Sequence, residues 1–121
     1  MNEIDMRTFA ANVGSNMRFP AGSVLFAQGH EGDCAFIVQS GSVEMMVGDR
    51  KVDECGENDM LGYMSLIDGS NRSSTARAVE DTQVSVIDAK QFRFMVDEIP
   101  NFASYVMGAM AQRIRGMAAS Y

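Results

Sequence analysis

The spacing of apolar residues changes twice along the chain, from a helical period to a period of two and back. Over residues 5–12, Met6, Phe9 and Ala10 recur at helical spacing, and Gly14 follows as a stop signal, which predicts a short helix. From about residue 17 to 89, apolar residues fall in short runs of period two, bounded by glycine, aspartate or asparagine. Such runs predict strands, here at 23–26, 34–38, 43–47 and 82–87.

Turn signals separate these predicted strands at short intervals. Gly48 and Asp49 stand between Val47 and Val52 and predict a hairpin turn. Many short strands with turns between them are typical of an antiparallel barrel or jelly roll. After residue 89 the period returns to 3.6, which predicts one helix up to a break before Pro100 and a second over about 101–118.

Each of the two predicted C-terminal helices carries an apolar face. In the first, Phe92, Met95 and Val96 share one side. The second has a longer stripe, made of Phe102, Val106, Met110, Ile114 and Met117. A surplus apolar face usually finds a partner, so we expect a homodimer through the helix at 101–118.

The predicted fold class is mainly β with flanking helices. One domain spans residues 1–121, with an antiparallel β jelly-roll barrel at about 17–89 and C-terminal helices at about 90–118. The 10 basic and 16 acidic residues give a formal net charge of −6, which repels a phosphate backbone, so we expect no nucleic-acid partner. An anionic ligand has to be bound locally, by arginine and backbone amides.

Few residues could carry catalysis or hold a metal. Cys34 and Cys55 form no paired motif and His30 is the only histidine, so neither a zinc site nor an iron–sulfur cluster can be assembled. The chain has no serine-hydrolase, zinc-protease or P-loop motif, and we expect no enzyme and no cofactor. With no secretory signal at the start and no run of about 18 apolar residues, we expect a cytoplasmic protein without a membrane partner.

One segment, residues 62–76, combines features that bind a phosphate. Gly62 allows a tight exit from a strand, residues 64–67 can form one helical turn with free amides, and Gly69 ends that turn. Arg72 then returns among three hydroxyl residues. This pattern predicts a phosphate cradle. The alternative from these residues alone is an arginine that pairs with a carboxylate on a surface loop.

A series of short motifs runs in order along nearly the whole chain. It consists of Phe19-Pro20-Ala21-Gly22, Leu25-Phe26-Ala27-Gln28-Gly29, Gly32-Asp33, Phe36-Ile37-Val38, Gly41-Ser42-Val43, Asn58-Asp59-Met60-Leu61-Gly62, Arg72-Ser73-Ser74-Thr75, Val86-Ile87-Asp88 and Phe92. This series resembles the cyclic nucleotide-binding domain family, the sensor domains of catabolite activator-type regulators, kinase regulatory subunits and gated channels.

The resemblance implies an eight-stranded jelly-roll barrel with a phosphate-binding cassette at residues 62–75. In the family an arginine, matched here by Arg72, neutralises the cyclic phosphate, helped by backbone amides near the positions of Met64 and Ser65. The ligand-binding residues that it implies are Gly62, Tyr63, Met64, Ser65, Arg72, Ser73 and Ser74. The implied ligand is a cyclic nucleotide, cAMP or cGMP, or a related phosphorylated molecule.

Two features depart from the family pattern. After the first glycine of the cassette the family usually has a glutamate that accepts hydrogen bonds from the ribose 2′-hydroxyl, and this chain has Tyr63. A lost charge-assisted hydrogen bond costs about 1.5–3 kcal/mol of binding free energy. No helix-turn-helix follows the last helix, so we expect a stand-alone sensor or a piece of a longer protein.

Two functions from different classes remain open. The first is a small-molecule sensor or regulatory module that binds a cyclic nucleotide, which Arg72 favours. The second is a degenerate, ligand-free domain that acts in protein interaction or dimerisation, which Tyr63 favours. In either case the domain can regulate a protein partner. A third possibility is another ligand in the same cavity, such as an apolar effector or haem with His30 as axial ligand.

Overall fold

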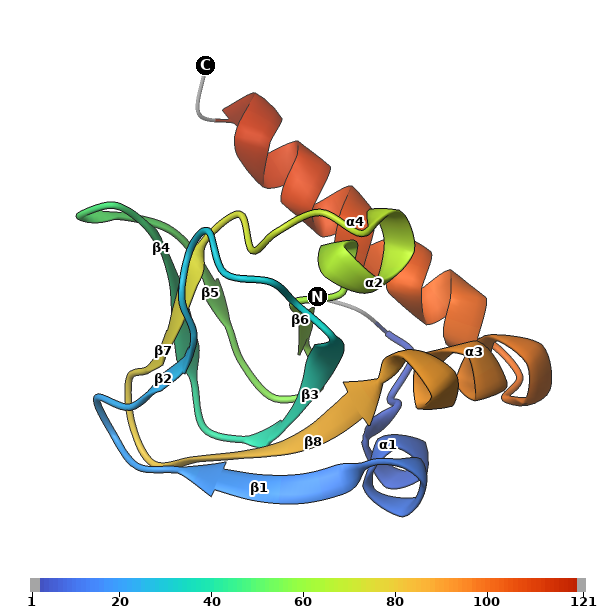
Figure 1. The fold of residues 1–121 in the computed structure, drawn as a ribbon. Helices are drawn as coiled ribbons and strands as arrows, with labels where there is room; N and C mark the ends of the chain where they lie inside the picture. Colours follow the sequence, from blue (N-terminus) through green and yellow to red (C-terminus); the bar gives the residue numbers. More distant parts are fainter. Residues whose placement is uncertain (1–2, 120–121) are drawn as a thin grey trace.

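The computed structural model describes residues 3–119, with side chains up to residue 116. Within this range eight strands form two antiparallel four-stranded sheets (Figure 1). The order β1-β8-β3-β6 in one sheet joins Ser15–Phe19, Thr82–Asp88, Cys34–Ser40 and Met60–Leu61. The order β2-β7-β4-β5 in the other joins Val24–Phe26, Thr75–Ala78, Val43–Val47 and Arg50–Cys55. The predicted jelly-roll fold is confirmed, and its first strand begins at Ser15 rather than near residue 17.

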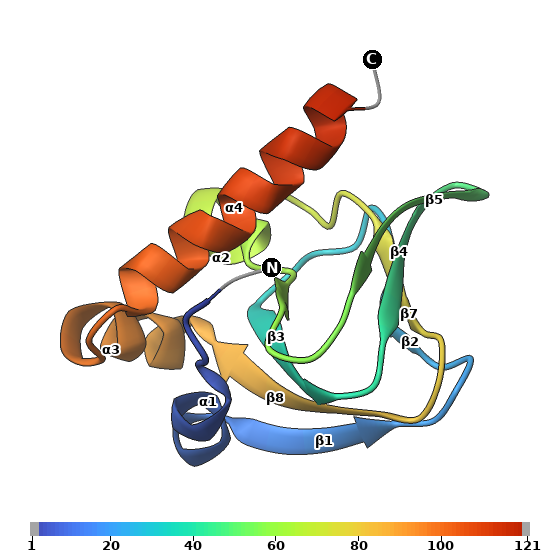
Figure 2. The ribbon, with the colours of Figure 1, turned by 180° about the vertical axis from the view of Figure 1, so that it is seen from behind.

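Four helices accompany the sheets in the described residues. They are α1 (Arg7–Val13), α2 (Met64–Asp68), α3 (Ala89–Glu98) and α4 (Phe102–Ala119). Helix α1 ends at Val13, and Gly14 follows it as the predicted stop. Figures 1 and 2 show α4 running past α2 and α3 along one side of the barrel. Among the described residues no helix is both long and apolar enough to cross a bilayer.

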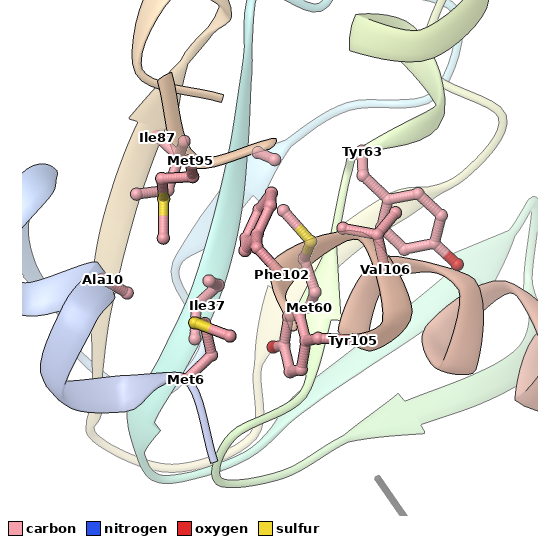
Figure 3. Close-up of a cluster of buried hydrophobic side chains, with 11 residues drawn as sticks. Met6, Ala10, Ile37, Met60, Tyr63, Ile87, Met95, Phe102, Tyr105 and Val106 are labelled. Atoms are coloured by element: carbon pink, nitrogen blue, oxygen red, sulfur yellow. The ribbon is translucent and has the colours of Figure 1, made fainter. Parts of the chain in front are cut away.

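Strands β3 and β8 separate two apolar clusters, because their side chains alternate between the two faces of one sheet. The barrel cluster fills the interior of the barrel with Phe36, Val38, Val43, Met45, Cys55, Leu61, Ala76 and Val84. The helix-side cluster lies between the same sheet and the helices, and Figure 3 shows most of it. Its members are Met6, Ala10, Ala35, Ile37, Met60, Tyr63, Ile87, Met95, Phe102, Tyr105 and Val106.

The hairpin between β4 and β5 forms at the predicted turn. Val47 pairs with Arg50, and Gly48 between them has a φ of +59°, which is the left-handed region. Strand β5 is exposed along most of its length and ends at the buried Cys55. This hairpin forms one edge of the second sheet.

Three predicted apolar faces differ from the structure in detail. Phe9 of α1 is 45% exposed and Val96 of α3 is 40% exposed, whereas Met6, Ala10 and Met95 are buried in the helix-side cluster and Phe92 packs at its edge. The stripe of α4 divides along its length. Phe102 and Val106 are buried, Met110 packs at the edge of the cluster, and Ile114 is 63% exposed. Met117 has its side chain outside the described residues.

The burial of Phe102 predicts a large effect of its removal. Phe102 is fully buried and its ring lies 5.6 Å from that of Phe92 and 6.0 Å from that of Tyr105, centroid to centroid. We expect Phe102→Ala to lower the free energy of unfolding by about 3–5 kcal/mol, measured by urea denaturation. The control Phe94→Ala removes the same side chain at a 49% exposed site and should cost under about 1 kcal/mol. Equal losses in the two variants would contradict this account of the core.

Candidate functional site

The connection from β6 to β7 takes the course that the sequence predicts. Gly62 has a φ of +75°, a conformation that favours glycine, and turns the chain out of β6. Helix α2 follows as a single short turn. Gly69, with a φ of 72°, ends it and donates its amide to the carbonyl oxygen of Ser65 at 3.0 Å. The chain returns through residues 70–74 to β7.

Arg72 is the charged residue that this connection buries. Its residue surface is 5% exposed, and its main chain makes two hydrogen bonds of 2.8 Å with the loop at residues 29–30. Nη1 donates to the carbonyl oxygen of Gly62 and Nη2 to that of Cys34, each at 2.7 Å. The guanidinium carbon lies 4.2 Å from the centroid of the Phe26 ring, within cation–π distance.

The positive charge of Arg72 has no carboxylate within ion-pair distance among the described residues. Its Nε is buried and has no hydrogen-bond partner in that part of the chain. A guanidinium does not lose its proton in a protein, and a buried charge without a counter-charge is costly. The alternative of a surface arginine paired with an acidic residue is therefore wrong, and an anion is the group that would complete this site.

Two glycines make room for the guanidinium. A Cβ on Gly62 would lie 2.7 Å from Nη1 of Arg72. A Cβ on Gly32 would lie 2.6 Å from Nε and Cζ of Arg72 and 2.5 Å from Oγ of Ser65. Sequence analysis predicted Gly62 as a turn residue. In the structure, the absence of a Cβ at both Gly32 and Gly62 leaves the space that the Arg72 side chain occupies.

A small cavity of about 20 Å³ adjoins Arg72. Its lining includes every ligand-binding residue that the family resemblance implied, namely Gly62, Tyr63, Met64, Ser65, Arg72, Ser73 and Ser74. It also includes four residues that sequence analysis did not select, namely Phe26, Met45, Asn71 and Arg113. None of these lining residues is acidic. The cavity holds about one water molecule, so any larger ligand must extend beyond it.

Three of these residues also line a larger hollow beside the cavity. Met45, Ser74 and Arg113 are shared, and the hollow has a volume of about 440 Å³ between the β4–β5 hairpin and α4. That volume lies in the usual range for small-ligand pockets. A ligand with an anionic end at Arg72 therefore has room for a second part in the hollow.

Two hydroxyls face this site. Ser65 and Ser74 are buried, at 6% and 2% exposure, and both line the small cavity. Ser74 also lines the larger hollow. Hydroxyl groups donate as well as accept, so they can add hydrogen bonds to an anion that Arg72 holds. Ser73 differs, since its Oγ accepts a hydrogen bond of 3.1 Å from Nη2 of Arg113.

Tyr63 has a structural role that the sequence did not reveal. It is 4% exposed and belongs to the helix-side cluster with Met60 and Val106 (Figure 3). It also lines the small cavity. Burial raises the pKa of its hydroxyl, partly offset by the nearby charge of Arg113. The phenol stays neutral at physiological pH. The position where the family usually has a charged acceptor thus holds a neutral ring that packs against α4.

Arg113 is the site residue that sequence analysis missed most completely. It stands 40 positions after Ser73, to which it donates, so no local motif marks it. It has no ion-pair partner within the described part of the chain. Through Arg113, helix α4 contributes a residue to the site. The only sequence signal for Arg113 was that this arginine stands near the end of the last predicted helix.

Burial keeps both cysteine thiols protonated. Burial raises the pKa of Cys34, and the nearby charge of Arg72 partly offsets that effect. Burial also raises the pKa of Cys55, to about 12, so both thiols stay protonated at neutral pH. In the residues the structure describes, no group of three or more histidine, cysteine, aspartate or glutamate side chains could hold a metal ion.

A jelly-roll barrel with a buried arginine on the connection between two strands, next to a ligand-sized hollow, is an arrangement that can hold a small anionic ligand. The family model described as "Cyclic nucleotide-binding domain" matches residues 16–98. The chain belongs to the cyclic nucleotide-binding domain family.

Curated relatives agree with this assignment. The chain is 30% identical over 102 residues to the "Cyclic AMP receptor protein" of Thermus thermophilus, covering 80% of this chain and 47% of that protein. It is 33% identical over 89 residues to the "cAMP-dependent protein kinase regulatory subunit" of Eremothecium gossypii, covering 74% of this chain and 19% of that protein. Both names are those of regulatory proteins. The chain spans at most about half the length of these relatives.

A solved structure shows the same fold. The catabolite activator protein of Thermus thermophilus superposes with a TM-score of 0.80 at 26% identity, over 98% of this chain and 58% of that one. This likeness agrees with the predicted jelly-roll barrel with helices before and after it.

The close approach at Gly32 yields a test of the site's geometry. Gly32→Ala places a methyl group against Arg72, which two hydrogen bonds hold in place, so we expect a loss of about 1–3 kcal/mol in the free energy of unfolding. Urea denaturation measures it. The control is Gly56→Ala, where a Cβ meets nothing within 4 Å. If Gly32→Ala is as stable as Gly56→Ala, the guanidinium is not held as described.

Proposed function

We propose that this chain is a small-molecule sensor module that binds a cyclic nucleotide through residues 62–75. The phosphate lies at Arg72, and the ligand-binding residues are Gly62, Tyr63, Met64, Ser65, Arg72, Ser73 and Ser74. The buried guanidinium of Arg72, which bonds only to neutral acceptors in the described chain, carries the proposal. The names of relatives that bind or depend on cyclic AMP support it.

The division of the site into two spaces supports a nucleotide rather than a free phosphate ion. A phosphate next to Arg72 receives hydrogen bonds from the guanidinium and from the hydroxyls of Ser65 and Ser74. The remainder of the ligand extends into the hollow along Met45 and Arg113. The module performs no catalytic step, and binding changes the contacts of α4 with the cassette.

One observation favours the second candidate function, a ligand-free interaction module. Tyr63 packs into the helix-side cluster, and it replaces the charged acceptor that the ribose meets in the family. A neutral phenol offers a weaker hydrogen bond than a carboxylate. A chain that had lost its ligand could keep the barrel and use it to contact a protein partner.

We make further proposals on the domain organisation, location and partners of the protein. Residues 1–121 form one domain, the protein is cytoplasmic, and it contacts neither nucleic acid nor membrane. We also propose a homodimer through the helix at 101–118. Its support is the exposure of Met107 and Ile114 on α4, at 60% and 63%.

The nucleotide proposal is tested by calorimetry with cAMP and cGMP. The native protein should bind at least one of them, and Arg72→Ala should weaken that binding by about 100-fold or more, since two charge-assisted hydrogen bonds to the phosphate are lost. The matched control is Arg77→Ala on β7, where the arginine is half exposed and pairs with Glu44. This variant should bind like the native protein.

The opposite result supports the interaction module. If the folded native protein binds neither nucleotide at millimolar concentration, the sensor proposal fails. Retention of binding by Arg72→Ala would place the ligand elsewhere in the molecule. Urea denaturation of each variant separates lost binding from lost folding.

The dimer proposal has its own measurement, sedimentation equilibrium at high micromolar concentration. The native protein should be a dimer, and Ile114→Glu should shift it toward the monomer, because two carboxylates would face each other across a two-fold interface. Val79→Glu changes a residue that is also exposed, at 47%, on the turn between β7 and β8, and should leave the dimer intact. A monomeric native protein refutes the proposal.

A further inference from the structure

We propose that the hollow beside the phosphate site selects guanine over adenine, and that Arg113 of α4 makes the selection. This inference rests on the proposed function, because it assumes a cyclic nucleotide whose phosphate lies at Arg72.

The position of the base follows from the shape of the site. The small cavity at Arg72 has room for about one phosphate oxygen or water, at about 20 Å³. The hollow of about 440 Å³ shares Met45, Ser74 and Arg113 with it, so the rest of the ligand enters the hollow there. Val47 and Val52 line the hollow as well and offer an apolar surface to the flat face of a base.

Arg113 stands where the two spaces meet. Its Nη2 donates to Oγ of Ser73, the residue next to Arg72, at 3.1 Å. One hydrogen bond uses one of the five N–H donors of a guanidinium, and among the described residues no carboxylate lies within ion-pair distance of Arg113. As far as the described residues go, the remaining donors are available to a ligand in the hollow.

The two purines differ in what they offer to such a group. Guanine presents two acceptors side by side, O6 and N7, which match the paired donors of an arginine. Adenine presents N7 beside the N6 amino group, which is a donor, and a guanidinium has no acceptor for it. Arg113 therefore gains two hydrogen bonds from guanine and at most one from adenine along this edge.

Besides Arg113, the polar residues that line the hollow are Arg50, Lys51, Asp53, Ser74 and Gln112, and two of them, Asp53 and Gln112, can bond to guanine as follows. Asp53 on β5 can accept from the 2-amino group, which guanine has and adenine lacks. Gln112 carries both a donor and an acceptor, so it can bond to either base. Glu54 and Asp59 lie with Asp53 in an adjoining recess that Arg113 also lines, and none of them pairs with it.

The experiment compares cGMP, cAMP and cIMP by calorimetry on the native chain. The inosine nucleotide keeps O6 and N7 and lacks the 2-amino group. A pair of hydrogen bonds to a base discriminates by roughly 5- to 150-fold, so we expect cGMP to bind at least about 5-fold more tightly than cAMP. We expect cIMP to bind more tightly than cAMP as well.

The decisive variant is Arg113→Gln, because a glutamine side chain matches N6 and N7 of adenine. It should remove or reverse the preference for cGMP while both nucleotides still bind through Arg72. The matched control is Arg115→Gln, an exposed arginine on the same helix that lines none of the three spaces described above. It should keep the native preference.

Failure of this inference differs from failure of the proposed function. Equal affinities for cGMP and cAMP in the native protein, or a preference that survives in Arg113→Gln, overturn the role of Arg113 and leave the nucleotide site standing. Binding of cIMP no tighter than that of cAMP overturns the contact with O6. Absence of binding by all three nucleotides removes the proposed function and this inference together.

Discussion

A guanidinium that is buried without a carboxylate needs hydrogen-bond acceptors from the main chain. Several segments of this protein are arranged to provide such acceptors for Arg72. Arg72 donates to the carbonyl oxygens of Gly62, directly after β6, and of Cys34, the first residue of β3. The glycines at 32 and 62 leave the space that it occupies. The connection between β6 and β7 therefore cannot shift by much without exposing or unpairing this charge.

The connection between β6 and β7 contacts α4 at two positions, one apolar and one polar. Tyr63 makes an apolar contact, since it shares the helix-side cluster with Val106. Arg113 makes a polar one, through Ser73. The two contacts lie at the two ends of the segment that holds Arg72. The anion site is therefore connected to α4 by packed side chains and by one hydrogen bond.

Periodicity located four of the eight strands, β2, β3, β4 and β8, and glycine positions located the turns at 48, 62 and 69. No strand range was predicted for β1, β5, β6 or β7, which are short or lack a clear alternation. Local pattern also predicted the segment that carries Arg72. It could not locate Phe26, Met45 or Arg113, because each reaches the site from a strand or helix distant in sequence. Nor could it show that Phe102 and Val106 are covered by the chain's own barrel, while Ile114 on the same stripe is exposed.

Helix α4 is supported unevenly, and its backbone dynamics should differ between its halves. The amides near Phe102 and Tyr105 belong to the core, so their exchange with solvent requires a large opening of the domain. The amides around Arg113 and Ile114 depend on few contacts and can exchange through local fraying. Any molecule that binds Arg113 stabilises this outer half, and by thermodynamic reciprocity a partner protein that holds the outer half would tighten the binding of that molecule.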